Sequence, residues 1–178
     1  YYLNNKLHRE NGPAKLLYDR NGNIRIEEYY QNGKLHRIKG PSFIRYYQNG
    51  NIERKEYYQN GYRHKVDGPA NIVYYDNSNI YFEEYFENGD LHRLDGPSII
   101  WYYKNGNIQR KEYFDNGQEH RENGPSYIEY DKNGNILKKE YWYNGKEVSI
   151  LQLEKAGIDT NNYLFSKSDM MKIKMHFG

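Results

Sequence analysis

Apolar and polar positions recur along the chain with a period of 28 residues, as the step from Pro13 to Pro41 shows. Each period contains a short β-rich run, such as residues 14–18, then turn residues, then a second run, such as residues 24–30. The second run ends at Asn-Gly, a pair that tolerates the positive φ of tight hairpin turns. The pattern predicts an all-β, solenoid-like antiparallel β-meander of five 28-residue hairpin repeats.

Positions that stay constant between repeats are expected to share one face, because a strand alternates its faces with period two. In the first run these positions hold a small residue, an aliphatic residue and a tyrosine, as in Ala14, Leu16 and Tyr18. We expect them to form the packed face. The intervening positions vary, and the variable aromatic and aliphatic residues predict a partner-binding face made of Phe43, Val73, Ile99, Trp101 and Tyr127.

Each repeat also carries a histidine and a Gly-Pro pair. Equivalent histidines are expected about 10 Å apart, because two strands of about 4.8 Å separate them. Zinc ligands lie about 2.0 to 2.1 Å from the metal, so neighbouring repeats are not expected to share an ion. We predict that each histidine anchors a turn by hydrogen bonds, with joint titration near neutrality as the alternative. The repeat-structural positions are His8, His36, His64, His92, His120, Gly12, Gly40, Gly68, Gly96 and Gly124.

A glutamate recurs in every second run, at Glu28, Glu56, Glu84, Glu112 and Glu140. Acid and base catalysis requires two carboxylates in different environments, whereas these five are repeated in the same one. We therefore expect them to pair with Arg or Lys across strands. No phosphate-binding loop or nucleophile motif is recognisable, so neither an enzyme nor a cofactor is predicted.

The repeat pattern stops after residue 146, which predicts a repeat domain over 1–146 and a capping segment over 147–178. Ser149 and Gln152 have the spacing of a helical capping box, with Gly157 as the stop. The last segment is compatible with a helix starting at Ser166 or Ser168, or with a strand over 171–177. We favour the helix, in which Met170, Ile173 and Phe177 share a face.

Composition limits the function further. The charges nearly cancel, with 26 Lys plus Arg against 24 Asp plus Glu, so nucleic acid is not an expected partner. The chain has 22 Tyr and a mean hydropathy of -1.18, so amphipathic rings must fill much of the core. There is no cysteine, no apolar run of about 20 residues and no recognisable signal peptide. A cytoplasmic location is expected, in the host cytoplasm or the virion if the protein is viral.

The string from Tyr29 to Pro41, Tyr-Tyr-Gln-Asn-Gly-Lys-Leu-His-Arg-Ile-Lys-Gly-Pro, resembles the MORN repeat. It is more similar to the variant found in bacterial antitoxin-type repeat proteins and in large DNA viruses. The resemblance covers residues 1–146, but the unit is longer than usual, and Arg and Gly-Pro follow the histidine. It implies a hairpin architecture and a scaffolding role, and it assigns no site residues.

Three kinds of function remain open. The first is a scaffold for an unidentified protein partner. The second is attachment to a membrane surface or a phosphoinositide, which the resemblance implies and which a basic amphipathic tail would serve. That tail combines Lys167, Lys172 and Lys174 with Met170, Met171 and Met175. The third is self-assembly through open strand edges, for example in a viral structural component.

Overall fold

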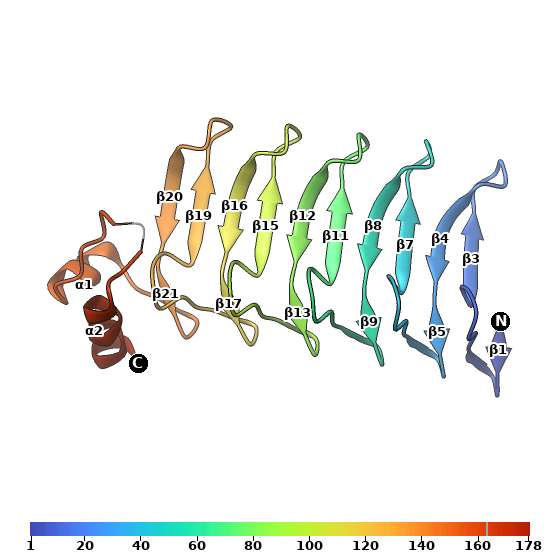
Figure 1. Cartoon of the computed structure of the whole chain (residues 1–178), viewed down its shortest axis with the longest axis horizontal. Coiled ribbons are helices and arrows are strands. Elements are labelled where there is room, and N and C mark those ends of the chain that lie inside the picture. The colour runs from blue at the N-terminus through green and yellow to red at the C-terminus, as the bar shows by residue number, and fades with distance from the viewer. Residues whose placement is uncertain (163) are drawn as a thin grey trace. The chain divides into compact units, whose positions relative to one another are not determined.

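The computed structural model describes residues 1–162 and 164–178, which form β-hairpins followed by two helices near the C-terminus (Figure 1). The chain forms two compact units. The first contains residues 1–90 and 104–106, and the second contains residues 91–103 and 107–178. The division between the units therefore lies within the repeats.

Each repeat contributes one long antiparallel hairpin. Its two strands come from the two β-rich runs of the sequence, which are rich in the β-branched and aromatic residues that strands favour. The first strands are β3 (Lys15–Tyr18), β7 (Phe43–Tyr46), β11 (Asn71–Tyr74), β15 (Ile99–Tyr102) and β19 (Tyr127–Tyr130), and the second strands are β4 (Ile24–Glu28), β8 (Ile52–Glu56), β12 (Ile80–Glu84), β16 (Ile108–Glu112) and β20 (Ile136–Glu140). The strand order is β3-β4-β7-β8-β11-β12 in the first unit and β15-β16-β19-β20 in the second.

A second, shorter hairpin follows each long one. The sequence predicts one continuous run over residues 24–30, but the strand is interrupted at Tyr29. The Tyr29 amide donates to the Ser42 carbonyl at 2.8 Å, and the Tyr29 carbonyl accepts from the His36 amide at 3.0 Å. The short strands are β1 (Tyr2–Leu3), β2 (Lys6–Leu7), β5 (Tyr30–Gln31), β6 (Lys34–Leu35), β9 (Tyr58–Gln59), β10 (Tyr62–Arg63), β13 (Phe86–Glu87), β14 (Asp90–Leu91), β17 (Phe114–Asp115), β18 (Gln118–Glu119), β21 (Trp142–Tyr143) and β22 (Lys146–Glu147).

The predicted turn chemistry is present at the tips of both kinds of hairpin. Asn32 and Gly33 in the short hairpin both have positive φ, 51° and 80°. These values suit the two-residue turns that match strand twist. The long hairpins turn through Gly22 and its equivalents, and Ser78 takes this position in the third repeat with φ 70°.

The small residue at the start of each long hairpin is buried and connects it to the next short hairpin. Ser42 has no exposed surface. Its Oγ donates to the Tyr58 carbonyl at 3.0 Å and accepts from the Tyr58 amide at 3.0 Å. Ser98 bonds in the same way to Phe114. Ala14 and Ala70 are buried at the same position without this bond, so burial accounts for the small side chain in every repeat and the serine hydroxyl adds the link.

The His-Arg-x-x-Gly-Pro segment forms an ordered loop. The Arg37 guanidinium lies 3.8 Å from the ring centre of Tyr29 and donates to the Pro41 carbonyl at 3.1 Å. Gly40 has φ 109°, and a Cβ there would approach the Arg37 guanidinium carbon to 3.2 Å. The loop therefore needs glycine for both its backbone conformation and the space that the arginine takes.

The C-terminal segment forms two helices, α1 (Ile150–Lys155) and α2 (Lys167–Phe177), so the predicted helical cap is confirmed. Ser149 and Ser166 each begin a helix with a capping box. The helices pack on the last short hairpin through one apolar cluster, which contains Tyr141, Tyr143, Val148, Leu153, Ile158, Phe165 and Ile173. Neither helix in the described residues has the length and apolarity needed to span a membrane.

Candidate functional site

The strand register places the repeat glutamates and the variable positions on one face of each unit. Glu28 lies opposite Lys15 on one side and Phe43 on the other, and residues opposite each other in an antiparallel pair share a face. We call this the glutamate face. It consists of Lys15, Leu17, Ile26, Glu28, Phe43, Arg45, Arg54, Glu56, Asn71, Val73, Phe82 and Glu84 in the first unit, and of Ile99, Trp101, Arg110, Glu112, Tyr127, Glu129, Lys138 and Glu140 in the second.

The five residues predicted to bind a partner all lie on this face, but not all are accessible. Phe43, Trp101 and Tyr127 are partly exposed. Val73 and Ile99 are each only 8% exposed, so their side chains offer little surface to a partner. Val73 lies between the longer side chains of Arg54 and Phe82 in the register, which leaves it little contact with solvent.

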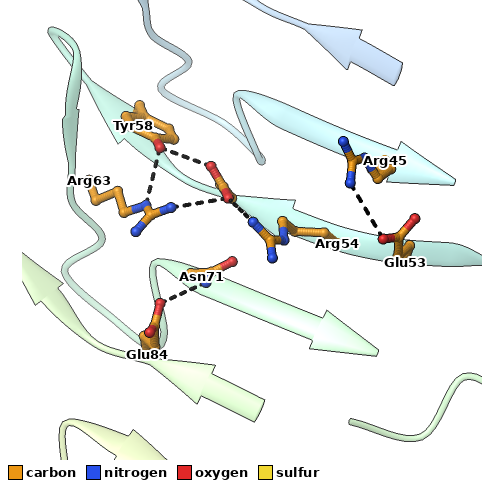
Figure 2. Close-up of polar contacts among 8 residues, drawn as sticks. Arg45, Glu53, Arg54, Tyr58, Arg63, Asn71 and Glu84 are labelled. Atoms are coloured by element: carbon orange, nitrogen blue, oxygen red, sulfur yellow. Dashed lines mark hydrogen bonds and ion pairs between the residues drawn. The ribbon is translucent and has the colours of Figure 1, made fainter. Parts of the chain in front are cut away.

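Glu56 is the centre of a charged network on the first unit. Its Oε1 lies 3.1 Å from Nη1 of Arg54 and 3.2 Å from Nη2 of Arg63. Its Oε2 accepts a hydrogen bond from the Tyr58 hydroxyl at 2.9 Å, and that hydroxyl accepts one from Arg63 Nε at 3.1 Å. Tyr58, Arg63 and Arg54 therefore converge on one carboxylate (Figure 2). The carboxylate is nearly buried, and its charge is compensated by the two guanidinium groups.

The other repeat glutamates each have a polar partner of their own. Lys15 lies 3.1 Å from Glu28, and Arg110 lies 2.7 Å from Glu112. The Asn71 amide donates to Glu84 at 2.7 Å (Figure 2), and Lys138 forms an ion pair with Glu140. Basic residues pair with four of the five glutamates. The pairing runs across strands, as predicted, at Glu28 and from Arg63 to Glu56, whereas Arg110 and Lys138 lie on the same strand as their glutamates. The glutamate is constant, whereas its partner changes from repeat to repeat.

Aromatic side chains of the short hairpins complete the frame around the glutamates. The Tyr30 hydroxyl donates to Glu28 at 3.1 Å, and Trp142 Nε1 donates to Glu140 at 3.4 Å. Burial, followed by the Glu28 carboxylate, raises the pKa of Tyr30 to about 12. These hydroxyl and indole groups therefore act as fixed hydrogen-bond donors near neutral pH.

Cations of the chain already stack on aromatic rings of this face. The Arg110 guanidinium lies 4.6 Å from the ring centre of Trp101 and 5.7 Å from that of Tyr127. Lys138 Nζ lies 5.4 Å from the Tyr127 ring centre. The face of the second unit can therefore hold positive groups by both charge and ring contact.

Glu112 and Glu140 each form an ion pair with a basic side chain, whereas the neighbouring Glu119 carboxyl receives a hydrogen bond from a serine. Burial is the main cause that raises its pKa to about 7. A hydrogen bond from Ser126 Oγ at 3.1 Å acts in the opposite direction, and the Glu112, Glu140 and Glu147 carboxylates raise the pKa further. A carboxyl with this pKa is present in both protonation states near neutrality.

On the opposite face of the sheet, aliphatic and tyrosine side chains of the first strands lie beside charged side chains of the second strands, as Ile44 lies opposite Glu27 and Lys55. Ile44 and Ile128 are buried there. Tyr46 donates to Glu27 at 2.8 Å, and burial followed by this bond raises the pKa of Tyr46 to about 12. The packing role that the sequence predicts for this face is met at the aliphatic positions, whereas Tyr18 is 56% exposed.

Each repeat histidine lies in a loop and contacts the next short hairpin. His36 Nδ1 is 3.1 Å from the Asn60 amide, and the same contact recurs in the other repeats. Within residues 1–162 and 164–178, no group of three or more His, Asp or Glu side chains is arranged to hold a metal ion.

The loops also expose aliphatic residues that the sequence analysis passed over. Ile38, Val66 and Leu94 are 78%, 79% and 86% exposed. They all occupy the second position after the repeat histidine, and this shared position is the signal that could have revealed them. In the second unit, Leu94, Leu164 and Met170 line an open cavity of about 930 Å³ together with charged residues of two loops.

The basic tail is partly engaged in internal contacts. Lys172 Nζ donates to the Gly157 carbonyl at 2.5 Å, and Lys174 Nζ lies 3.1 Å from Glu122. Met171 and Met175 are exposed. Two of the three lysines that were expected to contact an anionic surface therefore have a role in holding α2 in place.

Comparison with protein families agrees with this architecture. A family model described as a MORN repeat variant matches residues 15–32, 42–60 and 99–118. Each match covers one long hairpin and the start of the next short one, and together they support a MORN-like repeat protein. No curated protein matches the chain.

Proposed function

We propose that the chain is a non-catalytic scaffold that binds a protein partner on the glutamate face. The observation that carries the proposal is a constant frame of glutamates and aromatic rings on which variable side chains are partly exposed. Phe43, Trp101 and Tyr127 offer large contact area at a small cost in side-chain entropy. Val73 and Ile99 lie on the same face but are buried between neighbouring side chains. The proposal retains the cytoplasmic location expected from the sequence.

The test is a pull-down from extracts of the cells that produce the protein. The double variant Phe43→Ala, Trp101→Ala removes two partly exposed rings from the face. The matched control is Met171→Ala, Met175→Ala, which removes two exposed apolar side chains from α2 instead. We expect the first variant to lose the proteins that the wild type retains and the control to keep them. Retention of every partner by the first variant, with an unchanged circular dichroism spectrum, overturns the proposal.

The same variants separate the other proposals. If the wild type floats with anionic vesicles and the Met171→Ala, Met175→Ala variant does not, attachment to a membrane surface is favoured. An apparent molar mass from light scattering that rises with protein concentration would favour self-assembly through the strand edges. The internal contacts of Lys172 and Lys174 make the vesicle result the less expected one.

A further inference from the structure

Arg63 and Glu119 occupy equivalent positions in repeats that are two periods apart. Arg63 lies opposite Tyr58 in the short hairpin β9–β10, and Glu119 lies opposite Phe114 in β17–β18. The same position holds a leucine in three other repeats, at Leu7, Leu35 and Leu91. The exchange from a cation to an anion therefore occurs within one conserved backbone geometry.

In the first unit, the residue at this position is an arginine, and Glu56, Tyr58 and Phe86 hold its guanidinium group. The Arg63 guanidinium is 3.2 Å from Glu56, and its Nε is 3.1 Å from the Tyr58 hydroxyl (Figure 2). Its central carbon also lies 5.9 Å from the Tyr58 ring centre and 5.3 Å from the Phe86 ring centre. The chain thus contains a guanidinium group held by one carboxylate and two rings, one of which belongs to the next repeat.

In the second unit, the glutamate and the two rings are present without the guanidinium, and without the Tyr58 hydroxyl, because Phe114 has none. Glu112, Phe114 and Trp142 stand at the positions of Glu56, Tyr58 and Phe86. Glu119 replaces the arginine, and within the described residues its carboxyl receives one hydrogen bond, from Ser126 Oγ. The charged groups around it are the carboxylates of Glu112, Glu140 and Glu147, with Arg110 paired to Glu112 and Lys138 paired to Glu140.

The serine contacts show that the exchange changes the local structure. Ser42 and Ser98 use their hydroxyls to bond the backbone of the following short hairpin. Ser126 Oγ instead lies 3.1 Å from Glu119 and 3.5 Å from the Glu140 carbonyl. The Ser126 hydroxyl is therefore bonded to Glu119 rather than to the backbone of the short hairpin of its own repeat, and Glu119 still has unused acceptor capacity.

We propose that the position bounded by Glu112, Glu119, Glu140, Phe114 and Trp142 binds an arginine side chain of the protein partner. This inference rests on the proposed function, because it names the group that the glutamate face recognises. An arginine fits better than a lysine for two reasons. Its planar fork can bond two carboxylate oxygens at once, and its flat surface stacks on aromatic rings.

The size of Glu119 is compatible with such a guest. A glutamate side chain is shorter than an arginine side chain, so it reaches less far across the frame than Arg63 does in the first unit. Glu119 is partly exposed, and Glu147 beside it is exposed. A guanidinium bound here would form an ion pair with Glu119, as Arg63 does with Glu56 in the first unit.

The direct test is an NMR titration of the full chain at low ionic strength. The probe is the blocked tripeptide acetyl-Gly-Arg-Gly-amide, and the signal is the indole N–H of Trp142. The matched probe contains citrulline, which has the same shape as arginine but no charge. We expect a saturable shift with the arginine peptide and no shift with the citrulline peptide. Equal shifts with both, or no shift up to the solubility limit of the arginine peptide, overturn the inference.

Two variants control for structural effects. Glu119→Leu introduces the residue of the equivalent repeats, and Glu119→Gln keeps the size of the side chain while removing its charge. We expect both to fold and to abolish the arginine-dependent shift of Trp142. A shift that persists in both variants overturns the inference, because the guest would then contact Glu147 or Glu140 alone. In the wild type, the arginine peptide should also lower the pKa of Glu119, measured from the carbon-13 shift of its carboxyl.

The pull-down separates this inference from the proposed function. If Phe43→Ala, Trp101→Ala removes the partner but Glu119→Leu and Glu119→Gln retain it, the scaffold role stands and the arginine site fails. If the double variant retains every partner, the scaffold role fails, and the peptide titration alone decides whether the position binds a guanidinium.

Discussion

Nδ1 of His36 accepts a hydrogen bond from the backbone amide of Asn60 at a distance of 3.1 Å. Asn60 begins the tight turn of the next short hairpin with φ 53°, so the ring fixes the position of a turn in the following repeat. A nitrogen that accepts this bond carries no proton, which assigns the proton of the neutral ring to Nε2. At His92 the same atom also lies 2.9 Å from the Asp115 carboxylate.

Replacement of His36 by alanine is expected to lower the free energy of unfolding by about 0.5 to 1 kcal/mol. The loss is small because the Asn60 amide is exposed, so water can replace the ring nitrogen. Urea unfolding followed by circular dichroism measures it. His176→Ala, on α2 near the C-terminus, is the control and should change the stability by less. An unchanged midpoint for His36→Ala would show that the bond contributes nothing to repeat stacking.

Ser78 has the left-handed backbone conformation that glycine adopts at the equivalent position of the other long hairpins. Its φ is 70°, whereas Gly22 and Gly50 have φ 84° and 86°. A residue with a Cβ is strained by about 1 to 2 kcal/mol in this conformation. Glycine removes the strain, but its larger conformational entropy in the unfolded chain offsets about 0.5 to 1 kcal/mol of the gain. We expect Ser78→Gly to stabilise the protein by about 0.5 to 1 kcal/mol in urea unfolding.

Gly50→Ser provides the matched reverse change. It should destabilise the protein by a similar amount, because nothing within 4 Å obstructs a Cβ at Gly50 and only the backbone conformation opposes it. Loss of stability in Ser78→Gly would contradict the explanation from backbone strain.

The hairpins and helix starts were predictable because they depend on local chemistry. The turn at Asn32-Gly33 depends on the positive φ of these two residues, and the start of α1 depends on the capping box between Ser149 and Gln152. Residue identity at a fixed spacing is sufficient for such features. The interruption at Tyr29 was not predictable in this way, because its amide pairs with Ser42 of the next repeat while its carbonyl pairs with His36 in the short hairpin.

The candidate site was predictable only in outline. The spacing of the variable positions predicts that they share one face, which the register shows, but burial on that face depends on the length of neighbouring side chains across strands. Val73 is buried between Arg54 and Phe82, and no pattern along a single strand contains that information. The contrast between Arg63 and Glu119 depends on contacts with other strands, to Glu56 for Arg63 and to Ser126 for Glu119, which the repeat period alone does not contain.

Glu119 should make the stability of the second unit dependent on pH. Its pKa is about 7 in the folded chain and near 4.5 in an unfolded one. The folded state therefore binds the extra proton between these values, and stability is highest below pH 4.5 and falls as the pH rises to 7. The full shift corresponds to about 3 kcal/mol, and partial exposure reduces the expected loss to about 1 kcal/mol.

Glu119→Gln removes this titration. The variant should be more stable than the wild type by about 1 kcal/mol at pH 8 and nearly equal to it at pH 4.5. Thermal unfolding at several pH values between 4.5 and 8 gives the comparison. Glu154→Gln is the control, since Glu154 is exposed on α1 and is not among the groups that shift the pKa of Glu119. A constant difference between Glu119→Gln and the wild type across this range would contradict the assignment.

Leu153 tests whether the cap unfolds independently of the repeats. It is 1% exposed within the cluster that joins α1 and α2 to the last short hairpin. Leu153→Ala should cost about 3 kcal/mol, because it removes buried methyl groups and leaves a cavity. In a repeat protein this loss is expected to remain local, since each element is supported mainly by its neighbours.

Hydrogen exchange measures that local loss. Amides of α1 and α2 should exchange faster in Leu153→Ala, while those of β7 and β8 keep their wild-type rates. Leu151→Ala, at a position that is 59% exposed on the same helix, should leave both groups of amides unchanged. Equal acceleration in the helices and in β7 and β8 would mean that the chain unfolds as one cooperative body, so that damage at the cap spreads through every hairpin.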